Sequence, residues 1–199
     1  DTSYAVRSIM NKKAGGVKFV GVSTNAILWT AEFRAGSADT RPVRLTSASP
    51  CRERWIERNA DGGIALVWEG LDLGDERDMV TVRATVRFAS DGSSKWTLDV
   101  RNRSPRLGLF ATRYPILPRV SGDGTADCLL PRKDTGARLV RKLKWGKPYS
   151  FGCMGYCPMM IAFLIGDAGL YIAAHDGEAR IKSIEIDKEL GVSFFTPTE

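Results

Sequence analysis

Alternation of apolar and polar residues constrains the fold of this chain more than any other feature. It is clearest in MVTVRATVRF (79–88), where valine, alanine and phenylalanine alternate with threonine and arginine. Because successive side chains of a β-strand point to opposite faces, the pattern predicts a strand with one apolar and one polar face. KWTLDVRN (95–102) repeats the alternation, and Asp91 and Gly92 between the two stretches favour a tight reversal. The sequence therefore predicts a β-hairpin over 79–102 with a polar outer face.

Further stretches have the composition of strands. They are 25–34, 62–68, 159–165, 170–174, 180–187 and 192–195. In 159–165 and 170–174 consecutive positions are apolar, so we expect both strands to be covered on both faces and to lie at the centre of the fold. They flank the turn GDAG (166–169). One position of 180–187 is out of step with the alternation, which predicts a β-bulge.

Helical periodicity is scarce along the chain. No window of eleven or more residues combines a clean apolar stripe at three-to-four spacing with a capping signal. Many short strands separated by turns therefore predict an all-β, mostly antiparallel fold. The length of 199 residues is enough for a substantial hydrophobic core. We expect a single domain over 1–199, built as a large β-sandwich of two extended sheets.

The least regular part of the sequence is 114–158, which is rich in glycine, proline and charge, and we expect loops there. Residues 101–150 hold 12 Lys and Arg against 3 Asp and Glu, while the whole chain has a net charge of +6. Trp145 and Tyr149 lie among lysines in this region, and exposed aromatic rings stack on sugars or bases. A basic module that binds nucleic acid or acidic glycan is therefore one alternative, and a solvated arginine-rich surface is the other. The sequence contains no known nucleic-acid motif.

The cysteines and carboxylates give little indication of a metal site. The spacing of Cys51, Cys128, Cys153 and Cys157 is irregular and leaves disulfides and buried free thiols both open. Because no histidine or second close pair accompanies Cys153 and Cys157, we expect no zinc and no other cofactor. The acidic stretch 69–78 lacks the ligand spacing of a calcium loop, so we expect a solvated connection between strands. The longest apolar runs are far shorter than the roughly 20 residues of a membrane-spanning helix, so we expect no membrane span.

Three segments resemble, in order, the N-terminal domain of a group of bacterial glycoside hydrolases. They are NRSPRLGLFATRYPILPRV (102–120), LLPRKDTGARL (129–139) and MMIAFLIGDAGLYIAAHDGEARIK (159–182). The shared features are a strand ending in Tyr114 and Pro115, a loop with proline and glycine, and a hairpin whose second strand gives GLYIAAHD before a lysine. The resemblance covers roughly residues 60–190.

The resemblance implies a galactose-mutarotase-like β super-sandwich that precedes a catalytic (β/α)8 barrel. In such enzymes the catalytic carboxylates lie on the barrel, and a barrel of about 250 residues does not fit in this chain. The implied function is therefore that of a non-catalytic accessory domain. Its partners would be carbohydrate and a barrel of the same polypeptide, expected after Glu199. The resemblance also implies a secreted or periplasmic protein.

His175 is the only histidine, and it is followed directly by Asp176. Both come after the apolar stretch 170–174, where side chains leave the core and face a cleft in many proteins. The resemblance makes this hairpin a feature of domains that border the catalytic cleft. His175, Asp176, Trp145 and Tyr149 are therefore the predicted carbohydrate-binding residues.

Two other roles for His175 remain open. In the first, Asp176 caps the turn DGEA and His175 forms one hydrogen bond to loop backbone. In the second, the chain is a stand-alone sugar epimerase of the mutarotase type. That enzyme would use His175 as general acid and Glu178 or Glu185 as general base on the two sides of the sugar.

Overall fold

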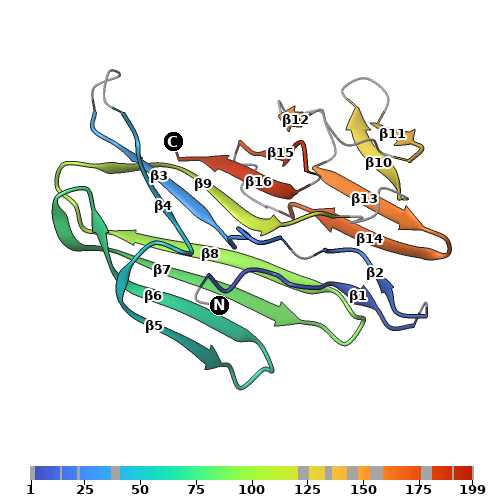
Figure 1. Ribbon diagram of the computed structural model, residues 1–199, viewed down its shortest axis with the longest axis horizontal. Coiled ribbons are helices and arrows are strands. Elements are labelled where there is room, and N and C mark those ends of the chain that lie inside the picture. The colour runs from blue at the N-terminus through green and yellow to red at the C-terminus, as the bar shows by residue number, and fades with distance from the viewer. Residues whose placement is uncertain are drawn as a thin grey trace. The chain divides into compact units, whose positions relative to one another are not determined.

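A computed structural model of the protein confirms the all-β prediction. It describes residues 3–13, 15–21, 23–36, 41–120, 126–132, 136–142, 148–152, 159–175, 181–189 and 191–198. Within these residues every regular element is a strand, and the strands pair antiparallel in several sheets of sandwich type (Figure 1). No helix in the described part of the chain is long and apolar enough to span a membrane.

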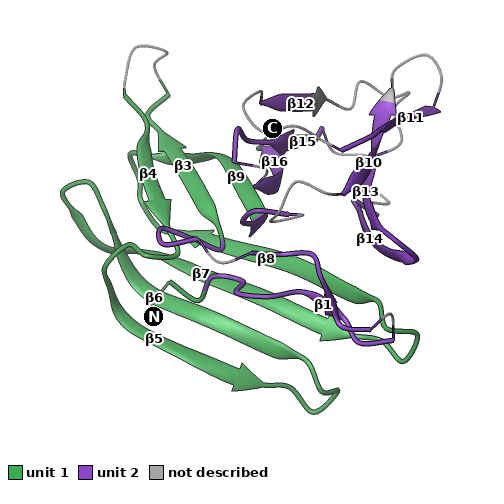
Figure 2. Ribbon diagram, turned by 45° about the vertical axis from the view of Figure 1, so that its right-hand side comes forward, with its two compact units in different colours: residues 1–4, 29–114, 198–199 green, residues 5–28, 115–197 purple. Residues whose placement is uncertain are grey.

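The chain forms two compact units (Figure 2). Unit 1 comprises residues 1–4, 29–114 and 198–199, and unit 2 comprises residues 5–28 and 115–197. Each unit has its own antiparallel four-stranded sheet and its own buried residues. The single domain expected over 1–199 stays a prediction.

Unit 1 contains a four-stranded sheet with the order β5-β6-β7-β8, and a second layer in which β3 lies between β4 and β9. The strand bounds are β3 (Thr30–Arg34), β4 (Val43–Thr46), β5 (Cys51–Arg58), β6 (Ile64–Leu73), β7 (Glu76–Phe88), β8 (Ser94–Asn102) and β9 (Gly108–Leu117). The core of the unit includes Trp29 and Trp68, whose rings meet edge to face with centroids 5.3 Å apart. Trp68 Nε1 donates to the backbone oxygen of Ser47 at 2.9 Å, so the buried indole is paired.

The predicted hairpin is the pair β7–β8. Ala89 N donates to Ser93 O at 2.9 Å, and Ser93 N donates to Asp91 Oδ1 at 2.8 Å, which closes the turn as the sequence predicts. The apolar face of β7 is buried from Val80 to Val86. Phe88 breaks the predicted pattern because it is 59% exposed. It is the last residue of β7 and pairs with Ser94 beside the turn, beyond the covered part of the face.

Unit 2 contains a four-stranded sheet with the order β11-β10-β13-β14, a layer in which β15 lies between β12 and β16, and the small pair β1–β2. The bounds are β1 (Met10–Asn11), β2 (Val17–Lys18), β10 (Asp127–Arg132), β11 (Gly136–Val140), β12 (Tyr149–Gly152), β13 (Met160–Ile165), β14 (Ala168–Ala173), β15 (Ser183–Ile186) and β16 (Val192–Pro197). The core of the unit is apolar. It includes Phe19, Ile161, Phe163, Ile184, Ile186 and Val192.

Two expectations for unit 2 were wrong in part. The stretch 114–158, expected to be loops, contributes the end of β9 and all of β10, β11 and β12. The apolar strands β13 and β14 are not covered on both faces, since Leu164 is 40% and Tyr171 is 56% exposed. Both residues lie on the same face of the sheet, which is only partly covered, whereas Ile161 and Phe163 on the other face are fully buried. β14 is also the outer strand of its sheet rather than a central one.

The bulge predicted in 180–187 is also absent from the described part of that stretch, 181–187. The strand β15 begins at Ser183 and keeps a regular register with β12 and β16, while Ile181 lies before it and is 53% exposed. The apparent break in alternation therefore marks the start of the strand.

Candidate functional site

The predicted site residues do not form one described cluster. His175 is exposed and follows the end of β14, as expected, with its ring centroid 6.5 Å from that of Tyr171. Tyr149 begins β12 and is partly buried against the core of unit 2. Trp145 and Asp176 lie outside the described residues, so their proposed roles stay predictions.

Two of the four cysteines can be described. Cys51 and Cys128 are free thiols, and Cys153 and Cys157 lie outside the described residues. Cys128 is fully buried in the core of unit 2, where desolvation raises the pKa of its thiol to about 12. Cys128 is therefore a packing residue that stays protonated.

The acidic stretch 69–78 comprises the end of β6, the turn at Gly74 and Asp75, and the start of β7, and its carboxylates pair with arginines. Asp72 Oδ2 accepts from Arg77 Nη1 at 2.5 Å, and Asp78 Oδ1 lies 3.0 Å from Arg52 Nη1. Asp75 pairs with Arg106. The described residues contain no group of three or more acidic, histidine or cysteine side chains that could hold a metal ion. The expected solvated connection is limited to Gly74 and Asp75, because 69–73 and 76–78 belong to strands in which Leu71 and Leu73 are buried.

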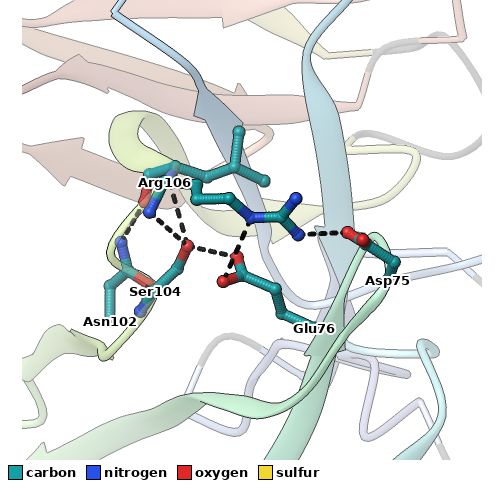
Figure 3. A network of polar contacts seen from close by, with 6 residues as sticks. Asp75, Glu76, Asn102, Ser104 and Arg106 are labelled. Carbon is teal, nitrogen blue, oxygen red and sulfur yellow. Dashed lines mark hydrogen bonds and ion pairs between the residues drawn. The ribbon is translucent and has the colours of Figure 1, made fainter.

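Figure 3 shows that this turn also fixes the loop from β8 to β9. Arg106 Nε lies 3.3 Å from Glu76 Oε1, and Ser104 Oγ donates to Glu76 Oε2 at 2.5 Å. Asn102 Nδ2 donates to Leu107 O at 2.6 Å across the same loop. Since these polar groups are hydrogen-bonded to one another, we interpret the network as a structural contact that holds the β8–β9 loop against the β6–β7 turn within unit 1.

The basic stretch 101–150 is neutralised in part where it is described. Arg101, Arg106, Arg113 and Arg141 each form an ion pair with a carboxylate. The pair between Arg113 and Glu32 joins β9 to β3 at 3.0 Å. Paired arginines present a weaker field to a polyanion than the sequence count suggests. These ion pairs favour the interpretation of the stretch as a solvated arginine-rich surface over its interpretation as a nucleic-acid-binding module.

A more specific arrangement lies on the outer face of the β5–β8 sheet. Cross-strand partners share a face of a sheet, so the pairing registers of the four strands define two rows there. One row is Trp55, Val67, Arg83 and Asp99, and the next is Glu57, Ala65, Thr85 and Thr97. We name these eight residues the Trp55 surface. The opposite face carries Trp68, Val82 and Ala84, which are buried.

Three side chains of the Trp55 surface are joined by hydrogen bonds. Glu57 Oε1 accepts from Trp55 Nε1 at 2.8 Å, and Glu57 Oε2 accepts from Arg83 Nη2 at 2.6 Å. The Arg83 and Glu57 side chains are 39% and 37% exposed, so both remain accessible. Val67 and Ala65 of the same rows are buried, so they support the surface from within and do not contact solvent.

The charges of this cluster are fixed by its contacts. Hydrogen bonds from Arg83 and then Trp55 lower the pKa of Glu57, and the hydrogen bond to Glu57 raises the pKa of Arg83. Glu57 is therefore ionised at neutral pH and acts as an acceptor only. An aromatic ring beside oriented polar groups matches a ligand that has an apolar face and a rim of hydroxyls.

Sequence reasoning missed this surface because it did not recognise β5. The stretch CRERWIER (51–58) is rich in charge, and only Trp55 and Ile56 mark it as a strand. The signal that could have found it is the spacing of Trp55 and Glu57, which places both side chains on one face of a strand. No protein-family model matches the chain, and no curated protein matches it.

Proposed function

We propose that the chain is a non-catalytic accessory domain of a glycoside hydrolase and that it binds carbohydrate through the Trp55 surface. The resemblance of 102–120, 129–139 and 159–182 to the domain that precedes a catalytic barrel supports the proposal. The all-β architecture is compatible with the galactose-mutarotase-like super-sandwich that this resemblance implies. A catalytic barrel of the same polypeptide and a secreted or periplasmic location belong to the same proposal.

The observation that carries the proposal is the hydrogen-bonded group of Trp55, Glu57 and Arg83 on one face of the β5–β8 sheet. A sugar ring has an apolar face of C–H groups and a rim of hydroxyls that both donate and accept. The indole offers a stacking face, while the carboxylate and guanidinium offer an acceptor and donors in fixed positions. Thr85 and Thr97 add hydroxyl groups in the neighbouring row. Pre-oriented side chains lose little conformational freedom on binding, which favours affinity.

Five carboxylates of the described residues are poor candidates for the acid of a glycoside hydrolase. Glycoside hydrolysis requires a pair of carboxyl groups, one of which has a raised pKa so that it can protonate the leaving group. Arginine or backbone contacts lower the pKa of each of Glu57, Asp72, Asp75, Asp91 and Asp127. These groups are held as carboxylates and are poor general acids at neutral pH.

Calorimetric titration of residues 1–199 with a panel of neutral and acidic oligosaccharides tests the proposal. We expect at least one to bind and Trp55→Ala to weaken that binding by about tenfold or more, the loss typical of a central aromatic contact. Phe88→Ala is the matched control, since Phe88 is an exposed aromatic of the same sheet outside the Trp55 surface. We expect it to leave affinity unchanged.

Two results would contradict the proposal. One is a Trp55→Ala variant that binds as tightly as the native chain. The other is release of reducing sugar by residues 1–199 alone, because the catalytic carboxylates are proposed to lie on another domain.

A further inference from the structure

The outer strand β14 of unit 2 is unlike the other outer strands of the two four-stranded sheets. Its sequence AGLYIA contains no charged residue, whereas β5, β8 and β11 all contain arginine. Within the described part of the chain, β14 pairs only with β13. Proteins protect open sheet edges with charges, prolines or bulges, and an uncharged edge is a template for another strand. The composition of β14 therefore points to a partner strand.

The backbone of β14 presents hydrogen-bonding groups on its open side. Ala174 N donates to Met159 O at 2.9 Å, so Ala174 directs its backbone groups toward β13. In an antiparallel ladder these directions alternate from residue to residue. The backbone N–H and C=O of Gly169, Tyr171 and Ala173 therefore point away from β13. Tyr171 lies at the centre of this open edge, and its side chain is 56% exposed.

We propose that β14 pairs antiparallel with β14 of a second copy of this chain, in a register centred on Tyr171. Tyr171 then faces Tyr171 of the second copy, and Gly169 faces its Ala173. All three positions direct their backbone groups outward, so the two strands exchange paired hydrogen bonds without any change in β14. The two four-stranded sheets join into one continuous sheet.

The polar residues that flank β14 favour a second copy as the occupant, because an imidazole N–H can donate to a carboxylate. In the register centred on Tyr171, Asp167 of one copy lies opposite His175 of the other, and the two-fold axis repeats this pair. Both residues are exposed and flank the uncharged strand. An acidic group before the strand and an imidazole after it match an antiparallel copy, whereas parallel pairing would place like groups together.

The side chains agree with this register. Leu139, Leu129, Ala162 and Tyr171 form one cross-strand row on a single face of the sheet. Leu139 and Tyr171, at its two ends, are 41% and 56% exposed. Pairing through β14 brings the two tyrosine rings together and extends the row across both copies. Aromatic cross-strand pairs are among the more stabilising in sheets. This proposal involves unit 2 and is independent of carbohydrate binding by the Trp55 surface.

Cysteine cross-linking tests the register. Directly opposed residues that exchange backbone hydrogen bonds have Cα atoms about 5.5 Å apart, which suits a disulfide. We expect Tyr171→Cys to form a covalent dimer under mild oxidation, with the disulfide between the two introduced thiols identified by peptide mapping. Thr97→Cys, at an exposed position of the outer strand β8, and the native chain are the controls, and we expect neither to dimerise covalently.

Sedimentation of the native chain and two charge variants provides the second measurement. We expect a native dimer, a tenfold or greater weakening in Asp167→Lys, and recovery when His175→Asp is added. Thermal unfolding of each variant separates a loss of association from a loss of folding. A native chain that stays monomeric at about 100 μM would overturn the proposal and leave a strand of another protein as the occupant of β14. So would dimers that fail to cross-link in the Tyr171→Cys variant.

Discussion

At the scale of single residues, burial decides the chemistry of Cys128. Its thiol is fully enclosed by the core of unit 2, and desolvation raises its pKa to about 12. The thiolate is the reactive form of cysteine, and its fraction falls tenfold for each unit by which the pKa exceeds the pH. Cys51, by contrast, is partly exposed in unit 1.

We predict that Cys128 resists alkylation by iodoacetamide at pH 8.5 while the protein is folded and reacts after unfolding in guanidinium. Peptide mapping by mass spectrometry distinguishes it from the other cysteines, and Cys51 serves as the partly exposed reference. Rapid labelling of Cys128 in the folded protein, at a rate similar to that of Cys51, would show that the core around it is open.

The alternation of apolar and polar residues predicted which side chains are buried better than which apolar side chains are exposed. Val80 and Val82 are buried as their alternation predicts, because a repeated period of two specifies a face. Phe88 and Tyr171 are apolar yet exposed, since one ends beside a turn and the other lies on an outer strand. Strand order depends on which strands pair, and the hydrophobic pattern of a single strand does not contain that information.

At the scale of elements, β6 contains an irregularity that no pattern in the sequence predicted. Its register with β7 shifts between Trp68 and Leu71, and Gly70 there has φ +69°. A Cβ atom at Gly70 would collide with Asp78 Oδ1 and lie 2.8 Å from Arg52 Cβ. The bulge therefore requires glycine both for its backbone conformation and for space.

We predict that Gly70→Ala lowers the free energy of unfolding by about 2–4 kcal/mol, because strain at positive φ adds to the steric conflict. Gly74→Ala is the matched control. Gly74 has φ +67° in the adjacent turn, but a Cβ there meets no atom within 4 Å. Its cost should be limited to about 1–2 kcal/mol. Urea denaturation measures both, and equal losses would contradict the steric part of the argument.

Element-scale reasoning from alternation and apolar runs found β3, β6, the hairpin β7–β8 and the strands β13 to β16, which are half of the strands in the described residues. The others are short or have a weak hydrophobic pattern. β5, for example, has five charged residues among its eight, so its hydrophobic signal is weak. The missed strand β5 carries Trp55 and Glu57. Without that strand, the sequence alone predicts a candidate site near His175.

At the scale of the whole molecule, two compact units present different surfaces. Unit 1 carries the Trp55 surface and a network of ion pairs around the β6–β7 turn. Unit 2 carries the uncharged edge of β14 with Tyr171 and His175. The proposed carbohydrate binding and the proposed self-association involve separate units, so we expect substitutions that abolish either one to leave the other unchanged.

The most direct test of carbohydrate binding by the Trp55 surface follows the indole N–H signals of the five tryptophans by NMR during titration with a bound oligosaccharide. The spectrum of a Trp55→Phe variant identifies the Trp55 signal. We predict that this signal shifts, because its N–H donates to Glu57 within the proposed site, while the signals of buried Trp29 and Trp68 stay in place. Saccharide binding that leaves the Trp55 signal unmoved would contradict the proposed binding surface.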